Sequence, residues 1–433
     1  MLVADQRLLE LHRTWQPYIK EAKPSPKIAE EIAQKLKEIG PQKQAAFAKI
    51  EQLRREHLSF LQEIVKISSV NPSRDFEKPL ASHLSAIMRG MGMEVQQFEP
   101  YPQRSSILAL YRGSKGKKTL WFNAHLDTVA PGNLADWTFS PFSATVRERV
   151  MYGRGVKDCK LGIAASLMAI KTLMECGIKL SHNVLLTFTA DEESGGHLGL
   201  NHLVQQKGLI KADWAVDCEG EPNRIELGHW GWLQFKLTSR GKAAHSSRKE
   251  KGLNAILQMG KVMPAVENMT FTSSNLEQPI VSVNMVEGGF KENVIPDQCT
   301  VTVDVCFPMG YTADGLMADI STLLDRLRQE DETLAFEPVK LINLARPSAI
   351  SRHEPIVSFL QAAVKEVCGS EPEVGIGRHT SDSRWILLDA QVPVVSYSCG
   401  GDSGHMPNEN VTLEDYIDNI KAYSLLCLLL LLH

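Results

Sequence analysis

The chain has 433 residues, more than one hydrophobic core usually organises, so we expect two domains or one domain with a large insertion. A formal net charge of −4 provides no basic field for nucleic acid, and no stripe of Lys and Arg with interleaved aromatic residues occurs, so a nucleic-acid partner is not expected. The eight cysteines are scattered without a CxxC pair, which predicts free thiols in a reducing compartment.

Neither end of the sequence indicates export or membrane insertion. The first residues lack the basic start and apolar run of a secretory signal peptide. The apolar run Leu425–Leu432 is too short to span a bilayer and is typical of a helix that packs into a core. The sequence therefore predicts a cytoplasmic protein with no membrane partner.

Residues 26–65 are charged and carry apolar side chains at helical spacing, which predicts surface helices that lead into the first domain. We assign residues 1–55 to an N-terminal helical extension. Strand and helix signals alternate after a loop that begins at Ser68. Strands are expected at residues 107–111, 119–123, 183–190 and 214–217, and helices at 162–176 and 198–207. This alternation is typical of an α/β sheet with helices on both faces.

The middle of the chain has a different order of elements. It predicts strands at residues 233–240, 280–287, 300–307 and 334–341, and helices at 253–267 and 313–329. The order β-α-β-β-α-β is that of a ferredoxin-like α+β domain. Because the last ninety or so residues return to α/β character, we predict a catalytic domain in two segments, 56–230 and 343–433, with a lid inserted at 231–342.

Polar residues gather where the predicted strands end. His125 closes an apolar strand, and Asp127 follows on the same strand face. Such a pair can ligate a metal through one ring nitrogen while the acid orients the imidazole, although a satisfied polar pair is the alternative. Asp158 precedes an apolar helix, where it is either the helix N-cap or a carboxylate that bridges two cations.

Three acids, Asp191, Glu192 and Glu193, follow another buried strand and precede a Gly-Gly pair. Acids crowded at a strand end repel one another unless cations neutralise them. Two adjacent glutamates also suit a division of labour, in which one binds metal and the other moves a proton.

Two further segments complete the set of candidate metal ligands. Asp217, Glu219 and Glu221 lie close together before Pro222, and His405 lies near the C-terminus in a Gly-His-Met-Pro-Asn-Glu segment. Each segment alone is unremarkable. Together with the preceding clusters they supply the mixed nitrogen and oxygen ligands expected for paired zinc ions.

The motifs HxD, GRGxxDxK, EExGG, GEP, NVIP and HxPNE occur in this order between about Glu56 and the C-terminus. The chain thereby resembles the dinuclear zinc amidohydrolases and peptidases that include acetylornithine deacetylase, succinyl-diaminopimelate desuccinylase, aminoacylase and bacterial glutamate carboxypeptidase. The resemblance implies a zinc-peptidase-like catalytic domain with a mixed central sheet, and a lid domain that also makes the dimer contacts.

The resemblance also implies that two divalent metal ions bind, zinc or alternatively cobalt. The metal ligands that it implies are His125, Asp158, Glu193, Glu221 and His405, with Asp158 as the bridge. Glu192 would be the general base and Asp127 the residue that supports His125. Glu219 and Asp217 remain rivals of Glu221, which is preferred because it lies in the Gly-Glu-Pro match.

Two lid residues have counterparts near the substrate in the resembling family. His245 matches a histidine that reaches into the neighbouring subunit's active site to stabilise the oxyanion, and Asn293 matches a residue near the substrate. A homodimer through the lid domain and a closing lid are therefore expected.

The chemistry expected of this centre is hydrolysis of an amide bond. Paired cations about 3.5–4 Å apart lower the pKa of a shared water, and the resulting hydroxide attacks a polarised carbonyl. The first candidate is an acetylornithine deacetylase-like enzyme that acts on a small-molecule N-acyl amino acid. A dipeptidase or carboxypeptidase and an amidase for a substrate without an α-carboxylate are the alternatives, and a non-catalytic binding protein is a distant one.

One departure bears on the substrate. Cys306 stands where family members that act on N-acyl amino acids carry an Arg that holds the substrate carboxylate. A thiol cannot offer the bidentate contact that a guanidinium offers. Arg378, Arg384 or Lys291 could replace that Arg, or the substrate could lack an α-carboxylate. We therefore expect Cys306 to face the substrate pocket and to alter specificity.

Overall fold

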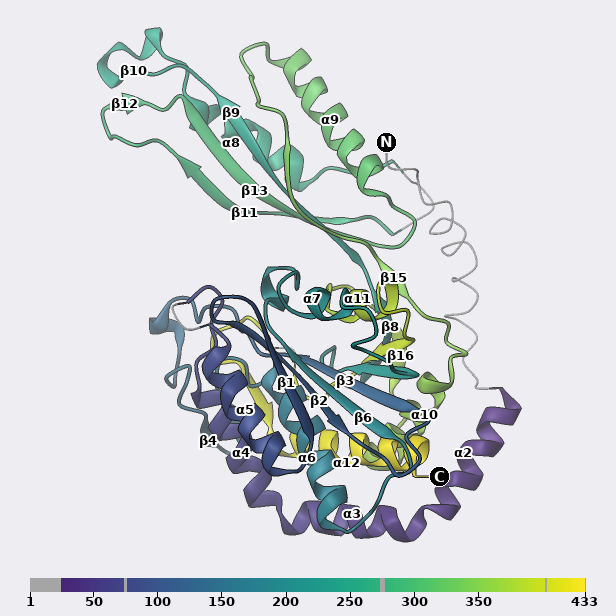
Figure 1. Cartoon of the computed structure of the whole chain (residues 1–433). Helices are drawn as coiled ribbons and strands as arrows, with labels where there is room; N and C mark the ends of the chain where they lie inside the picture. Colours follow the sequence, from purple (N-terminus) through teal and green to yellow (C-terminus); the bar gives the residue numbers. More distant parts are fainter. Residues whose placement is uncertain (1–24, 74–75, 273–276, 402, 433) are drawn as a thin grey trace. The chain divides into compact units, whose positions relative to one another are not determined.

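The computed structural model describes residues 25–73, 76–272, 277–401 and 403–432 (Figure 1). They divide into two compact units. The smaller unit contains His229–Ser348 and Arg378–Thr380, and the larger contains the described residues up to Gly228 together with Ala349–Gly377 and those from Ser381 on. The predicted lid, residues 231–342, lies within the smaller unit. Residues 1–24 of the predicted N-terminal extension lie outside the described residues.

A mixed sheet forms the centre of the larger unit. Its strands follow the order β1-β2-β6-β3-β7-β17-β8-β15, with β16 beside β8. Neighbours β6, β3, β7 and β17 are parallel, whereas β1, β2 and β6 pair antiparallel. The strands are β1 Glu94–Tyr101, β2 Arg104–Tyr111, β3 Thr119–His125, β6 Asn183–Thr189, β7 Trp214–Asp217, β8 Arg224–His229, β15 Ser348–Ala349, β16 Glu373–Gly377 and β17 Val394–Ser396. The predicted mixed α/β sheet is confirmed.

Helices cover both faces of this sheet (Figure 1). On one face lie α5 Lys78–Gly90, α6 Lys160–Glu175, α10 Pro355–Cys368 and α12 Leu413–Leu431. On the other lie the short helices α7 Leu200–Val204 and α11 Ser383–Leu388, which pack on Trp121 and Leu185. Strands β3 and β6 are therefore buried along their whole length, which explains why their sequences are continuous apolar runs rather than alternating ones.

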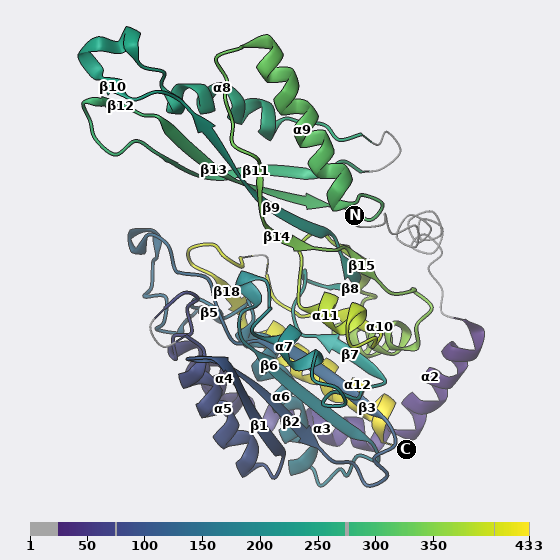
Figure 2. The ribbon, with the colours of Figure 1, turned by 45° about the horizontal axis from the view of Figure 1, so that its top comes forward.

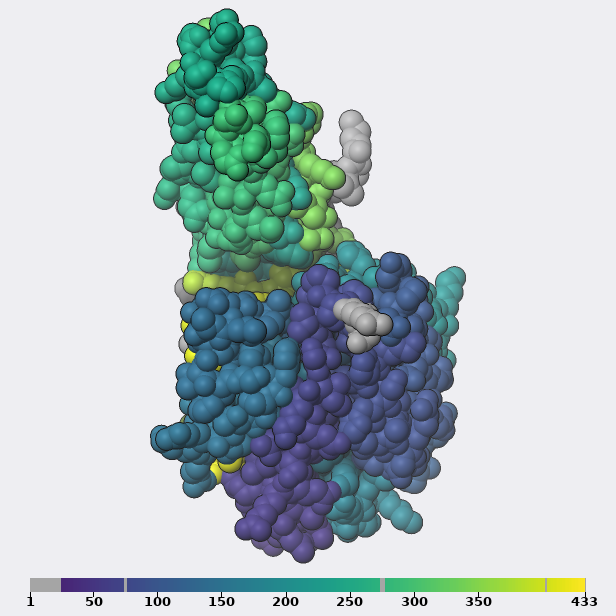
Figure 3. Space-filling model, turned by 90° about the vertical axis from the view of Figure 1, so that its left-hand side faces the viewer, coloured from purple at the N-terminus to yellow at the C-terminus, as the bar shows by residue number. Residues whose placement is uncertain are grey.

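The N-terminal helices are part of the core of the larger unit. Helices α2 Pro26–Glu38, α3 Gly40–Gln52 and α4 Arg54–Lys66 bury one apolar stripe each, and Ile39 and Ile50 are fully buried in the main core. Lys35 Nζ donates to the carbonyl of Leu429, near the end of α12, where the carbonyl has no partner within the helix. In Figure 3 the outer sides of these helices, in purple, form part of the surface of this unit.

The C-terminal apolar run forms the last turns of α12, and Leu425–Leu431 are buried against α6 and α10. This confirms the prediction of a core helix. Among the described residues, no helix combines the length and the apolar composition that crossing a bilayer requires. A small sheet of three short strands, β4 Thr145–Arg147, β5 Val150–Tyr152 and β18 Asn410–Thr412, joins the C-terminal segment to the segment before α6.

The smaller unit is an antiparallel sheet with two helices packed on one face (Figure 2). Its strands β9 Gly231–Arg240, β11 Ile280–Gly288, β13 Gln298–Phe307 and β14 Lys340–Ala345 lie in the order β11-β13-β9-β14. Helices α8 Ala255–Glu267 and α9 Ala313–Glu330 complete the β-α-β-β-α-β order of the predicted ferredoxin-like domain. A separate ribbon pairs β10 Ala244–His245 with β12 Val294–Ile295.

Two expected elements differ from the structure. The helix expected at 198–207 is only the five-residue α7, which begins at Leu200 because the backbone angles of Gly199, φ −103° and ψ −111°, are not helical. The strand expected at 334–341 begins only at Lys340. Phe336 makes an isolated bridge to Ser239 of β9, and Pro338 lacks the N–H that would continue the ladder.

A buried histidine on α4 predicts a pH dependence of stability. His57 is fully buried, with Nε2 3.5 Å from Thr172 Oγ1, and burial lowers the pKa of its imidazole below 6.5. The unfolded chain therefore takes up a proton at higher pH than the folded chain does. The stability that neutral His57 contributes is complete above pH 6.5 and is lost as the pH falls towards the folded-state pKa. The free energy of unfolding in urea should fall less between about pH 7 and about pH 5 in His57→Gln than in the wild type.

The wild type, unfolded over the same pH range, supplies the reference. The same pH dependence in His57→Gln and wild type would contradict the role assigned to burial.

Candidate metal centre

The carboxyl ends of four neighbouring parallel strands carry the polar residues of the predicted centre. His125 ends β3 and Glu193 follows β6, while Glu219 follows β7 by two residues and His405 lies in the segment after β17. Because β6, β3, β7 and β17 are consecutive in the sheet and parallel, these segments emerge at one edge. Sites of open α/β sheets form at that edge.

Asp158 lies between the two histidines, just before α6. Its Oδ1 is 2.9 Å from His125 Nε2, and its Oδ2 is 3.2 Å from His405 Nε2. Each carboxylate oxygen therefore faces a different imidazole. This is the arrangement expected of a carboxylate that bridges two cations, each of which also has one histidine ligand.

Each histidine also has a glutamate beside it, which would be a further ligand of the same ion. Glu193 Oε2 is 3.0 Å from His405 Nε2, and Glu219 Oε2 is 3.6 Å from His125 Nε2. Ligand atoms of His125, Asp158 and Glu193 lie within 4.8 Å of one another. The structure thus brings together His125, Asp158, Glu193 and His405 from the predicted set, and adds Glu219.

A main-chain contact selects the tautomer of His125. Its Nδ1 lies 2.9 Å from the carbonyl oxygen of Asp127, which can only accept, so Nδ1 carries a proton and Nε2 is the nitrogen available to a metal. The carboxylate of Asp127 is farther away, with Oδ1 3.6 Å from the same nitrogen. Asp127 therefore supports His125 mainly through its backbone rather than through its side chain.

The side chain of Asp127 instead holds the backbone of the two glutamates. Its Oδ1 accepts the N–H of Glu192 at 3.1 Å, and its Oδ2 accepts the N–H of Glu193 at 3.2 Å and Nδ2 of Asn71 at 3.0 Å. Asp127 is fully buried. One carboxylate thus fixes the segment that carries both the predicted base and a predicted ligand.

Arg104 extends this network below the glutamates. The buried guanidinium donates to Asn71 Oδ1 at 3.0 Å and to Asp191 Oδ1 at 2.7 Å, and it pairs with the buried Glu77 at 2.9 Å. Asp191 has φ 73°, a left-handed conformation that non-glycine residues seldom adopt, and it directly precedes Glu192. Arg104 therefore anchors the turn that presents the base.

Burial and mutual repulsion set the protonation of these groups. Burial raises the pKa of Glu192 well above its ordinary value, and the charge of Glu219 raises it further. Although burial opposes it, hydrogen bonds with His125 and His405 hold the pKa of Asp158 well below its ordinary value. Hydrogen bonds with Asp158 and Glu193 raise the pKa of His405 to about 11. Three carboxylates, those of Asp158, Glu193 and Glu219, thus face two imidazoles at this edge.

The residues present fit a pair of divalent cations. The carboxylates outnumber the imidazoles, so added positive charge would offset the cost of burying them. Imidazole and carboxylate together are ligands that suit zinc. Cys159 also lies near His125 and Glu219, but burial raises the pKa of its thiol well above its ordinary value, and the thiol donates to the Cys218 carbonyl. We therefore leave Cys159 out of the ligand set.

Glu221 has a different position from the one expected. Its Oε2 pairs with Arg224 Nη1 at 2.6 Å, whereas Glu219 lies beside His125. Gly220 separates the two glutamates with φ 132°, and its carbonyl accepts Nζ of Lys157 at 2.7 Å. This turn sends the two side chains to different neighbours. The sequence favoured Glu221 as the ligand, whereas the structure favours Glu219.

Comparison with known proteins identifies the family of the chain. Residues 121–428 match the profile of peptidase family M20/M25/M40. The chain belongs to this family. It is accordingly an M20 metallo-hydrolase that acts on amide or peptide bonds, and its family members typically bind divalent metal.

Solved structures of M20-like proteins share the fold. An M20 family metallo-carboxypeptidase from Sulfolobus solfataricus matches with a TM-score of 0.71 at 21% identity, over 86% of this chain and 99% of the other. A di-peptidase from Saccharomyces cerevisiae matches with 0.78 at 16% identity, over 89% and 98%. Human carnosine dipeptidase 1 matches with 0.75 at 18% identity, over 89% and 99%. At these identities the likeness establishes the fold.

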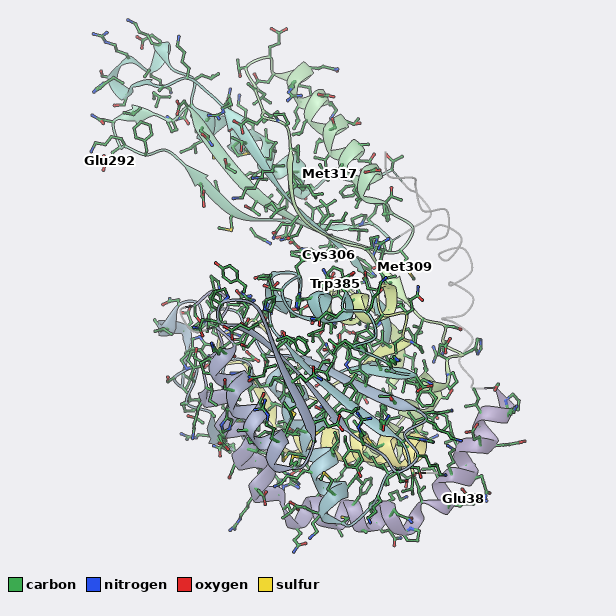
Figure 4. The ribbon with its side chains drawn as sticks, in the orientation of Figure 1. Glu38, Glu292, Cys306, Met309, Met317 and Trp385 are labelled. Carbon is green, nitrogen blue, oxygen red and sulfur yellow. The ribbon has the colours of Figure 1, made fainter. Side chains whose placement is uncertain are left out.

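The predicted lid residues lie in the smaller unit of this M20 protein. His245 is exposed on β10, and Asn293 directly precedes β12, the strand that pairs with β10. The carbonyl of Asn293 accepts the N–H of Ser246 at 3.0 Å, so the structure places both residues on one ribbon. Figure 4 labels the neighbouring Glu292 at this end of the unit.

Cys306 and Arg378 lie elsewhere in the smaller unit. Cys306, labelled in Figure 4, lies near the end of β13, and its thiol donates to Asp304 Oδ2 at 3.8 Å. Burial raises the pKa of the Cys306 thiol to about 11, so it remains neutral. Arg378 pairs with Glu277 and lies over the ring of Trp230, 5.4 Å from its centroid. The contacts of these two side chains with a substrate remain predictions.

Several residues of the centre carried little or no sequence signal. Arg104 is a single Arg at the start of a strand, and nothing in its surroundings marks it. Asn71 lies in the loop after Ser68, which was expected only as a turn. Arg154 and Glu409 lie inside the GRGxxDxK and HxPNE motifs, but the sequence assigned neither a role. Burial of their charges could have drawn attention only after the fold was known.

Measurement of metal affinity decides whether Glu219 or Glu221 is the ligand. Glu219→Gln should weaken binding of one of two ions by about 100-fold or more, because even second-sphere changes cost 10–100-fold. Glu221→Gln, the matched control, should bind both ions as the wild type does. Competition with a chromophoric chelator measures both affinities. Loss of an ion in the Glu221 variant alone would restore the preference from the sequence.

Proposed function

We propose that this M20 protein is a peptidase that hydrolyses short peptides, as a dipeptidase or carboxypeptidase, with two divalent metal ions, zinc or alternatively cobalt. The observation that carries the proposal is the position of Asp158, whose two oxygens face His125 and His405 separately. The metal ligands in this proposal are His125, Asp158 and Glu219 for one ion, and His405, Asp158 and Glu193 for the other.

One observation favours a peptide over an N-acyl amino acid. The similar structures named above are a carboxypeptidase and two dipeptidases. The neutral thiol of Cys306, where the deacylases carry an Arg, bears instead on whether an α-carboxylate is recognised, since peptides and N-acyl amino acids both carry one. We therefore rank the peptidase first and the acetylornithine deacetylase-like activity second, which reverses the order expected from the sequence motifs. An amidase for substrates without an α-carboxylate is the third candidate.

The bound ions would act as Lewis acids towards the scissile carbonyl and would acidify water at neutral pH. The protein's own part begins with Glu192, which takes a proton from the attacking water and passes it to the leaving amine. Its raised pKa suits the first step, because burial makes the Glu192 carboxylate a stronger base than an exposed one. Asp127 and Arg104 hold the backbone on which Glu192 is carried, through the contacts described above.

The smaller unit would supply the remaining groups. We propose that His245 donates to the oxyanion in the partner subunit's site and that Asn293 contacts the substrate, as the family resemblance implies. The edge strand β11 exposes apolar side chains that a dimer would cover, with Ile280 50%, Met285 57% and Val286 58% accessible. A cytoplasmic location is part of the same proposal, consistent with eight free cysteines.

Replacement of the base separates catalysis from metal binding. Glu192→Gln keeps the size of the side chain but cannot accept a proton, so kcat should fall by roughly 100- to 10,000-fold. Metal content, measured by elemental analysis, should remain two ions per chain. The substrates tested are dipeptides, tripeptides and N-acetyl amino acids. The substrate with the highest kcat/KM in the wild type identifies the activity. Full activity in Glu192→Gln would exclude the proposed base.

Cys306→Arg tests the specificity assigned to the lid. An Arg at this position should raise kcat/KM for substrates with an α-carboxylate relative to amides without one by about tenfold or more, since a charge-assisted bidentate contact exceeds a neutral one. Cys306→Ser is the control and should leave the ratio near that of the wild type. An unchanged ratio in the Arg variant would show that Cys306 does not face the pocket.

Charge on the β11 edge tests the dimer. Val286→Lys should shift the protein from dimer to monomer in sedimentation velocity, because a lysine in an apolar interface loses its hydration. Leu134→Lys is the control, since Leu134 is 63% accessible on the larger unit. A monomeric wild type, or a dimer that survives Val286→Lys, would contradict an interface at β11.

A further inference from the structure

A fully buried glutamate beside the centre accepts four donors from one segment. Glu409 Oε2 accepts Nη1 of Arg154 at 2.7 Å and the N–H of Gly155 at 2.9 Å. Its Oε1 accepts the N–H groups of Lys157 at 2.8 Å and Asp158 at 3.0 Å. Both oxygens are thus saturated by the loop that ends in the bridging carboxylate.

The contact with Asp158 acts on the geometry of the centre directly. A hydrogen bond to the backbone N–H of a residue fixes its main chain, and thereby the direction in which its side chain leaves. Asp158 must place two oxygens opposite two histidines at once, 2.9 Å and 3.2 Å away. A small rotation of its backbone would move both oxygens, so Glu409 constrains both halves of the centre together.

Arg154 joins the same cluster to the other histidine. It is 1% accessible, and its second terminal nitrogen, Nη2, donates to the carbonyl of His405 at 3.2 Å. His405 has φ 63°, a left-handed conformation that non-glycine residues adopt only when their surroundings enforce it. The guanidinium therefore fixes the backbone of a predicted ligand while the same group pairs with Glu409.

Chain connectivity explains why such a clamp is needed. Asp158 and His405 lie on segments far apart in the sequence, and these segments meet where β18 pairs with β5. Glu409 directly precedes β18, and its carbonyl accepts the N–H of Gly153, which directly follows β5. The clamp thus lies at the junction of the two segments, between the sheet that joins them and the two ligands that they carry.

We propose that Glu409, together with Arg154, is a positioning residue of the metal centre that sets Asp158 and His405 for binding of the ion at His405. The inference rests on the proposed function, because it presumes that these residues bind metal. Neither side chain contacts the reacting groups. Their effect is on the affinity for metal and, through it, on turnover.

A purely structural ion pair would act differently. Its loss would lower the melting temperature without changing the metal affinity of the molecules that remain folded. A positioning pair changes the affinity of the folded protein for both ions through Asp158, and most strongly for the ion at His405, because it holds both Asp158 and His405. The two roles are therefore separated by titration of metal at a temperature at which each variant is folded.

The experiment compares Glu409→Gln and Arg154→Lys with the wild type. In Glu409→Gln, the amide N–H₂ group faces the N–H donors that the carboxylate accepts. In Arg154→Lys, the positive charge beside Glu409 is kept, but the ammonium cannot donate to Glu409 and to the His405 carbonyl with the planar geometry of a guanidinium. Zn²⁺ is titrated by competition with a chromophoric chelator, and folding is checked by circular dichroism. We expect about 10- to 100-fold weaker binding of the ion at His405 in each variant, the range seen for second-sphere changes, and a smaller loss at the other ion.

Arg54→Lys is the control, because Arg54 pairs with Glu414 between α4 and α12, away from the centre. It should bind both ions as the wild type does. If Glu409→Gln does not fold, Arg154→Lys decides alone. Wild-type affinity for both ions in a folded Arg154→Lys or Glu409→Gln variant overturns the inference. Failure of the wild type to bind metal would instead overturn the proposed function.

Discussion

Like charges buried at one edge of a sheet are the constraint on which the rest of this structure depends. Strands β6, β3, β7 and β17 are parallel neighbours, so the acids that follow β6 and β7 emerge beside His125 at the end of β3. Burial raises the pKa values of Glu192, Glu193 and Asp217, which expresses the cost of charging them there. A pair of divalent cations would offset that cost, and would simultaneously provide the Lewis acid that amide hydrolysis requires.

The protein holds this edge together with buried cations that contact carbonyls and carboxylates around the ligands. Arg104 anchors the turn before Glu192, Lys157 holds the turn between Glu219 and Glu221, and Arg154 joins the loop of Asp158 to the segment of His405. Lys160 donates to the Ile67 carbonyl, and burial lowers the pKa of its ammonium to about 7. Each of these contacts fixes backbone rather than substrate. The arrangement is a preorganised centre, in which the cost of ordering is met during folding.

The sequence predicted the elements that have strong periodic signals. Buried strands such as β3 and β6 are continuous apolar runs, and the polar residues at their ends, His125, Glu192 and Glu193, mark the site edge. Asp158 and His405 follow no such run, and the resemblance to the family motifs singled them out. The β-α-β-β-α-β order of the smaller unit followed in the same way, because its strands alternate and its helices are long. Very short strands such as β10 and β12 carry too few residues to show a period.

What the sequence could not give depends on turns and on tertiary contacts. Glu219 and Glu221 both follow β7 closely, and only the conformation at Gly220 decides which carboxylate lies beside His125. The partners of Arg104 are distant in sequence, so its place could not be read from its neighbours. The N-terminal helices showed an amphipathic period, but not that Ile39 and Ile50 would be buried in the main core.

The most direct test of the central claim is anomalous X-ray diffraction at the zinc absorption edge from crystals of the protein loaded with zinc. The account predicts two peaks per chain on either side of the Asp158 carboxylate. One would be bound by His125 and Glu219, and the other by Glu193 and His405. A single peak, or no peak at Asp158, would contradict the dinuclear centre. A peak bound by Glu221 in place of Glu219 would contradict the ligand assignment.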